Sequence, residues 1–135
     1  MSTVRRVHYT YAEYLALEEG SSVRHEYLDG EIYAMADGSP DHAALAAALI
    51  SVIRSQLPPG CRMFTSDLWV RIPATGLSTY PDAAVVCGRT QRAADDALAV
   101  VNPLFLVEVT SPSTEEYDRN EKFRHYKTSR ASARC

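Results

Sequence analysis

The most constraining feature of the sequence is an acidic residue inside an almost continuous apolar segment. Residues 103–109 read Pro-Leu-Phe-Leu-Val-Glu-Val, which has the length and composition of a strand buried on both faces. A carboxylate in such a strand is costly unless it is neutralised, paired or bound to a metal. We therefore expect Glu108 either to pair with a cationic side chain or to belong to a functional site.

A second acidic residue, Asp82, stands at the start of another apolar run. It follows Tyr-Pro and precedes Ala-Ala-Val-Val-Cys at 83–87, and taken alone a Pro-Asp pair is a common turn signal. If the two apolar strands are neighbours, Asp82 and Glu108 come close together, and close carboxylates repel unless a cation lies between them. Carboxylates are usual ligands of Mg²⁺, which serves phosphodiester hydrolysis. The structural alternative is that both acids pair with arginines.

Patterns along the rest of the chain predict one domain with helices and strands. Thr10 and Glu13 form a capping box, and Asp29-Gly30 separates two strand-like runs, which is a strong hairpin signal. The segment 89–102 has a weak Ala-rich helical pattern and is expected to be a surface connection. The expected helices and strands are 11–19 (helix), 23–28 and 31–36 (hairpin), a helix of about 17 residues after Ser39-Pro40 whose apolar face packs on the core, 68–72, 82–87 and 103–109 (strands), and 113–127 (polar helix).

Composition limits the class of protein. The 135 residues fit a single domain, 1–135, with 46% hydrophobic and 23% charged residues. No segment reaches the roughly 18 apolar residues of a membrane span, so a cytoplasmic protein without membrane contact is expected. The three cysteines form no C-x-x-C pair, which suggests neither a disulfide framework nor a zinc site. The net charge of −3 argues against general electrostatic coating of nucleic acid but not against an enzyme that cleaves it.

Six short segments in order give the chain a resemblance to a known family. Together they resemble the Uma family of bacterial restriction-endonuclease-like proteins, within the PD-(D/E)xK nuclease superfamily. The resemblance implies an α+β (α/β) fold, with a central mixed sheet flanked by helices and preceded by a short helix and a hairpin. The segments are Tyr-Leu-Asp-Gly-Glu-Ile-Tyr at 27–33, Ser-Pro-Asp-His at 39–42, Ser-Asp-Leu-Trp-Val-Arg at 66–71, Tyr-Pro-Asp at 80–82, Glu-Val-Thr-Ser-Pro-Ser-Thr at 108–114 and Tyr-Asp-Arg-Asn-Glu-Lys at 117–122.

The same resemblance implies a metal-dependent endonuclease that acts on DNA, with Mg²⁺ or Mn²⁺ as cofactor. Asp82 and Glu108 would be metal ligands, together with the backbone carbonyl of Val109. In the plain superfamily motif a lysine follows the glutamate by two residues, but that position is Thr110. In this family a lysine on the following helix replaces the motif lysine, and the matching residue is Lys122. Its implied role is to orient the attacking water or to stabilise the pentavalent phosphate. Its alternative role is an exposed ion pair within its own helix.

Two further residues of the family-like segments are auxiliary candidates. Glu31 would be an additional metal or water ligand, or else a solvated strand residue after the turn. His42 lies in the first turn of its expected helix, where it would hydrogen-bond a site residue or face solvent.

The C-terminal end departs from the family pattern. Relatives would continue past the last helix with a further strand, whereas residues 127–135 show no strand pattern. We therefore expect a missing final core strand and an open edge on the Glu108 strand, through which the chain would form a homodimer or aggregate. The alternative function is a catalytically inactive, truncated remnant or a non-catalytic binding module of the same fold.

Overall fold

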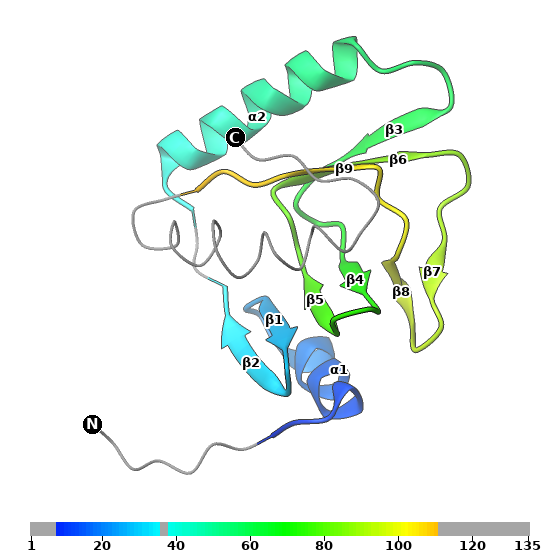
Figure 1. The fold of residues 1–135 in the computed structure, drawn as a ribbon. Coiled ribbons are helices and arrows are strands. Elements are labelled where there is room, and N and C mark those ends of the chain that lie inside the picture. Colours follow the sequence, from blue (N-terminus) through cyan, green and yellow to red (C-terminus); the bar gives the residue numbers. More distant parts are fainter. Residues whose placement is uncertain (1–7, 36–37, 111–135) are drawn as a thin grey trace.

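The computed structural model describes residues 8–35 and 38–110. The expected helix at 113–127, which carries Lys122, and any strand after it lie outside these residues. The elements run in the order α1 (Tyr11–Gly20), β1 (His25–Leu28), β2 (Glu31–Ala34), α2 (Pro40–Ser55), β3 (Cys61–Phe64), β4 (Val70–Ile72), β5 (Leu77–Thr79), β6 (Ala83–Cys87), β7 (Arg92–Ala93), β8 (Asp96–Val100) and β9 (Phe105–Val107) (Figure 1).

The described strands form two sheets. Six strands pair in the order β2-β1-β5-β4-β8-β7, and three pair in the order β3-β6-β9. The pair β4–β8 is parallel and the other pairs are antiparallel. Helix α2 lies beside the three-stranded sheet and α1 beside the six-stranded sheet (Figure 1). The expected α+β fold with a mixed sheet is confirmed, although its strands divide between two sheets.

The β1–β2 hairpin forms as predicted because its turn residues accept an uncommon backbone conformation. Tyr27 pairs with Ile32 across the hairpin, and both turn residues have positive φ, 50° at Asp29 and 79° at Gly30. Asp-Gly is a preferred sequence for such a turn, whose twist matches that of the flanking strands. A Cβ at Gly30 would also lie 2.3 Å from the ring of His8, so this position requires glycine for two reasons.

Helix α1 begins with the predicted capping box, in which the backbone N–H of Glu13 donates to the Thr10 hydroxyl and the Glu13 side chain accepts from the Thr10 N–H. The helix is held to the sheet by an aromatic cluster centred on Tyr14, which is fully buried. Its ring lies 5.3 Å from that of Tyr27 and 5.7 Å from that of Trp69, centroid to centroid. Burial raises the pKa of the Tyr14 hydroxyl well above its ordinary range.

The two sheets share one hydrophobic core. Leu28, Val70, Ile72 and Leu77 come from the six-stranded sheet, whereas Ala84 and Leu106 come from the three-stranded sheet, with Leu68 packed against them. Each core residue is at most 4% exposed, which is the burial expected of a close-packed interior. This core fixes β6 and β9 relative to the β1–β5 region.

Helix α2 has its predicted start at Ser39-Pro40 and ends at Ser55, but its apolar face packs differently from expectation. No α2 residue is buried, and Leu45 and Val52 are 50% and 55% exposed. Within the described part of the chain, α2 packs beside β3, which is an edge strand of the three-stranded sheet. The prediction that this whole face packs on the core is therefore wrong for Leu45 and Val52.

The segment expected to be a weakly helical connection instead forms the β7–β8 hairpin. Arg92 pairs with Val100, and Val100 also pairs in parallel with Val70 of β4. Asp96 at the start of β8 accepts a hydrogen bond of 2.8 Å from the Tyr11 hydroxyl. These long-range contacts outweigh the weak helix propensity of the Ala-rich sequence. Among the described elements, no helix is long and apolar enough to cross a membrane.

The expectation that the cysteines form no disulfide is wrong for one pair. Cys61 of β3 and Cys87 of β6 are directly opposite each other in the antiparallel register and are joined by a disulfide. Their Cα atoms are 4.0 Å apart, although the residues are separated by 26 positions in the sequence. Sequence spacing could not reveal this pair, because the contact depends on the register of two distant strands.

Replacing both Cys61 and Cys87 with serine should lower the free energy of unfolding by about 3 kcal/mol under oxidising conditions, because the cross-link restricts the unfolded chain. Urea unfolding of the oxidised wild type and of the double variant measures the difference. The same pair of titrations in excess dithiothreitol is the control, since reduction should bring the two proteins close together. Equal stability under oxidising conditions would contradict a stabilising role for the disulfide.

Candidate active site

The pairing of β6 with β9 brings the two predicted acidic residues together. The strands are antiparallel, with Ala83 opposite Val107 and Ala84 opposite Leu106. Continuing this register by one residue places Asp82 beside Glu108. Ala84 and Leu106 both belong to the shared core, and alternate residues of a strand share a face. Asp82 and Glu108 therefore extend that face at the adjacent ends of the two strands.

Asp82 has one close contact at each carboxylate oxygen, a hydrogen bond at Oδ2 and an ion-pair contact at Oδ1. The backbone N–H of Val109 donates to Asp82 Oδ2 over 2.6 Å, and Nε2 of His42 lies 3.3 Å from Asp82 Oδ1. The same Nε2 lies 3.0 Å from the carbonyl oxygen of Val109. Asp82, Val109 and His42 thus contact one another pairwise, and this three-residue set is called the Asp82 triangle below. The structure thus places His42, an auxiliary candidate from the sequence, in contact with Val109 and Asp82, and its role at a site stays a prediction.

His42 reaches the triangle because of the way α2 begins. Ser39 is the N-cap, and its hydroxyl accepts a 3.1 Å hydrogen bond from the backbone N–H of His42. The preceding loop must leave space for the imidazole, since a Cβ on Gly38 would lie 2.6 Å from Nδ1 of His42. The helix N-terminus also carries partial positive charge, which favours the nearby Asp82 carboxylate.

Glu108 is the second acidic residue at the strand ends, where it directly follows β9. The residue is 7% exposed, and it precedes Val109, whose carbonyl oxygen belongs to the triangle. Two carboxylates and one carbonyl are hard donors of the kind that bind Mg²⁺ or Mn²⁺ together with water and phosphate oxygens. Within the described ranges there is no group of three or more His, Cys, Asp or Glu side chains that could hold a metal by themselves. The donor set fits a cation that keeps water and substrate ligands, rather than one enclosed by protein.

Of the other predicted site residues, Glu31 is placed differently. It lies on β2, the outermost strand of the six-stranded sheet, where it accepts a hydrogen bond from the Tyr33 hydroxyl. Asp82 and Glu108 adjoin the three-stranded sheet. The described contacts join His42 with Asp82 and Val109. Lys122 falls outside the described residues.

Glu26 is a buried carboxylate that no motif in the sequence singles out. It is 8% exposed, and its Oε2 accepts a 3.0 Å hydrogen bond from the hydroxyl of Thr79, which is fully buried. The sequence could have indicated the burial of Glu26, because it lies two residues before Leu28 and alternate residues of a strand share a face. Thr79 ends β5 and lies three residues before Asp82, so Glu26 is anchored to the segment that leads into the site.

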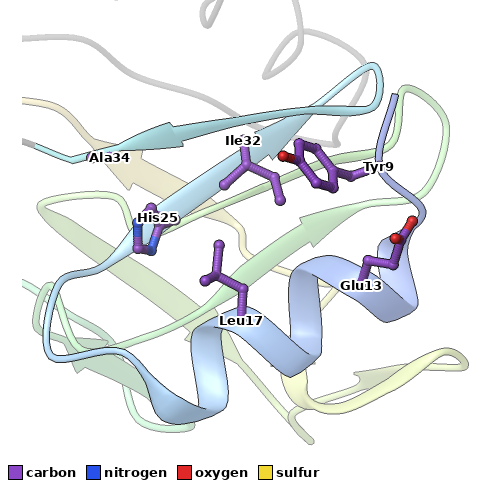
Figure 2. Close-up of a pocket in the computed structure, with 6 residues that line it drawn as sticks. All are labelled: Tyr9, Glu13, Leu17, His25, Ile32 and Ala34. Carbon is purple, nitrogen blue, oxygen red and sulfur yellow. The ribbon is translucent and has the colours of Figure 1, made fainter. Parts of the chain in front are cut away.

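A separate hollow lies between α1 and the β1–β2 hairpin (Figure 2). Its volume is about 540 Å³, and it is open to solvent. Neither acidic residue of the strand ends lines it, and its histidine is held by Glu18 through a 3.1 Å contact. The hollow is therefore distinct from the candidate active site. Its lining residues are Tyr9, Glu13, Leu17, His25, Ile32 and Ala34.

The mixed α+β architecture and the acidic residues at the ends of paired strands define a protein with a restriction-endonuclease-like fold. The chain belongs to the Uma2 family, described as "Putative restriction endonuclease", whose model matches residues 11–132. The family resemblance predicted from the sequence motifs is thus confirmed.

Two similar proteins come from Synechocystis sp., and each is described as an uncharacterized protein. The protein slr1290 is 42% identical over 115 residues, which cover 84% of this chain and 60% of that protein. The protein sll1609 is 33% identical over 122 residues, which cover 88% of this chain and 68% of that protein. The chain thus spans well under the full length of these relatives.

A solved structure from Anabaena variabilis has a similar fold. It is described as "a putative nuclease belonging to DUF820" and superposes with a TM-score of 0.70. The alignment has 24% sequence identity and covers 89% of this chain and 69% of that chain. At this identity the likeness supports the fold.

Proposed function

We propose that this protein is a metal-dependent endonuclease that hydrolyses phosphodiester bonds in DNA. The observation that carries the proposal is the position of Asp82 and Glu108 at the adjacent ends of the paired strands β6 and β9, with the Val109 backbone hydrogen-bonded to Asp82. The oxygens of these residues suit Mg²⁺ or Mn²⁺, and family membership supports nuclease chemistry. The chemistry that such a cation supplies is a lower pKa for an attacking water and neutralisation of phosphate charge.

The protein's own groups would prepare the site for this reaction. The Val109 N–H fixes Asp82 through Oδ2, which leaves Oδ1 as the oxygen for a cation. Glu108, which directly follows β9 and is buried, would provide the second carboxylate. Such pre-positioned ligands reduce the reorganisation needed in the transition state. Lys122 would stabilise negative charge on the phosphate or orient the attacking water.

A second candidate is a non-catalytic binding module of the same fold. The observation that favours it is Thr110, which stands where the plain superfamily motif has its lysine. The two candidates differ in whether another lysine supplies the missing cationic group.

Lys122→Ala should slow DNA cleavage by roughly 10²–10³-fold, because it removes a group that stabilises charge developing in the transition state. Nicking of supercoiled plasmid with Mg²⁺ or Mn²⁺ measures the rate, and excess EDTA should abolish it.

Lys127→Ala is the matched control, because it removes the same charge five residues away. Wild-type cleavage by both variants would reject Lys122 as the catalytic cation. Absence of metal-dependent cleavage by the wild type would instead favour the non-catalytic module.

A further inference from the structure

His42 contacts the same atoms that the proposed metal site would use. Its Nε2 lies 3.0 Å from the Val109 carbonyl oxygen and 3.3 Å from Asp82 Oδ1. A carbonyl oxygen can only accept a hydrogen bond, so Nε2 must carry the proton. A protonated ring nitrogen has no lone pair for a metal. In this arrangement His42 therefore acts as a hydrogen-bond donor, not as a ligand.

We propose that His42 competes with the divalent cation for Asp82 Oδ1 and the Val109 carbonyl, and so lowers the metal affinity of the site. This inference rests on the proposed function, because it assigns a regulatory and positioning role at the same site. The hydrogen bond from the Val109 N–H to Asp82 Oδ2 involves neither contested oxygen. Asp82 therefore keeps its orientation when the imidazole is exchanged for a cation.

The surroundings of the ring are consistent with such an exchange. The His42 side chain is 22% exposed, so it has a route toward solvent, whereas the Asp82 side chain is 18% exposed and is tied to the strand end. On its Nδ1 side the ring is close to Gly38, where an added Cβ would lie only 2.6 Å away. Gly38 thus provides the space that allows the ring to reach the two oxygens.

Competition and direct ligation predict opposite effects of removing the imidazole. If His42 competes, His42→Ala should bind Mg²⁺ and Mn²⁺ about three- to tenfold more tightly, the factor that corresponds to losing one ordinary hydrogen bond. If His42 is a ligand, the same substitution should weaken binding. His42→Gln can retain an N–H donor near the ring position, so its affinity should stay closer to that of the wild type.

The test is calorimetric titration of Mg²⁺ and of Mn²⁺ into the wild type, His42→Ala, His42→Gln and Gly38→Ala at one fixed pH. Gly38→Ala keeps the imidazole but displaces it, so this variant should also bind the cation more tightly. If His42→Ala folds poorly, Gly38→Ala provides the test of competition. Circular dichroism confirms folding of each variant. Without added metal, ¹⁵N NMR of the wild-type ring should show the proton on Nε2.

The outcomes separate this inference from the function on which it rests. Tighter binding by His42→Ala and Gly38→Ala supports competition, and it does so even if wild-type binding is too weak to measure. Weaker or unchanged binding by His42→Ala, with a wild type that binds metal, overturns competition and leaves the metal site intact. Failure of every variant to bind either cation overturns both proposals.

Discussion

Asp82→Asn should abolish divalent-metal binding and lower DNA cleavage by roughly 10³-fold, because a catalytic metal contributes several kcal/mol of transition-state stabilisation. The structure gives the reason in atomic terms. The Val109 N–H requires an acceptor at the Oδ2 position, so the single oxygen of Asn must turn toward it. The Asn NH₂ then faces His42 and the Val109 carbonyl, where it repels a cation instead of binding one.

The same geometry predicts that this variant folds. The Asn oxygen keeps the hydrogen bond to the Val109 N–H, and Asn has nearly the same shape and volume as Asp. Its free energy of unfolding should therefore stay close to that of the wild type. Calorimetric titration of Mg²⁺ and Mn²⁺, plasmid nicking and urea unfolding together distinguish loss of the site from loss of the fold.

Asp67→Asn is the matched control, because it removes one carboxylate charge from an exposed side chain that pairs with Arg24. Metal binding and cleavage by this variant should match the wild type, since an exposed ion pair contributes little. If Asp82→Asn binds metal as tightly as Asp67→Asn does, the strand ends are not the metal site.

The parts of the fold that depend on local sequence could be predicted. The capping box at Thr10, the Asp29-Gly30 turn and the Ser39-Pro40 start each place their signal within a few residues, and each forms where expected. The two apolar strands were recognisable from their composition, but their pairing entered the sequence argument only as a condition, which the structure meets.

The features that could not be predicted depend on contacts between distant segments. The β7–β8 hairpin is stabilised by pairing with β4 and by the Tyr11–Asp96 hydrogen bond. The disulfide depends on the register of β3 against β6. Asp82, Val109 and His42 were candidates from the sequence, but their mutual contacts could not be predicted, because the approach of His42 depends on where the N-terminus of α2 lies relative to Val109. Such positions follow from packing and are not encoded in residue spacing.

The arrangement of the triangle also links the fold to the proposed chemistry. Val109 contributes only backbone atoms, its N–H to Asp82 and its carbonyl oxygen to His42. Its side chain is 7% exposed and belongs to the core. The positions of both polar backbone groups therefore depend on the hydrophobic packing of Val109, two residues after the end of β9. Any change that shifts β9 should move the acid and the imidazole together, so site geometry and core packing are expected to be coupled.

Tyr14→Ala should lower the free energy of unfolding by about 4 kcal/mol, because it empties a fully buried aromatic site on which α1 packs. Polar groups would also lose a partner. The Tyr14 hydroxyl donates to the backbone oxygen of His25 over 2.6 Å and accepts from Trp69 Nε1 over 3.1 Å. Tyr14→Phe removes these hydrogen bonds and the 3.2 Å contact of the hydroxyl with Glu18 Oε2, and it should cost about 1–3 kcal/mol because partly buried groups lose a partner.

Urea unfolding measures the free energy of unfolding of the wild type and both variants. Tyr33→Ala is the control, because Tyr33 is 43% exposed and its replacement should change stability by no more than about 0.5 kcal/mol.

The raised pKa of Tyr14 gives a second, independent readout. Because the hydroxyl is neutral in the folded protein, its contribution is complete below the ordinary tyrosine pKa of about 10 and is lost as pH rises above it. Between about pH 9 and 11, a range on both sides of that ordinary pKa, the free energy of unfolding should therefore fall less for Tyr14→Phe than for the wild type. Equal stability of Tyr14→Ala and Tyr33→Ala would mean that α1 is not anchored through Tyr14.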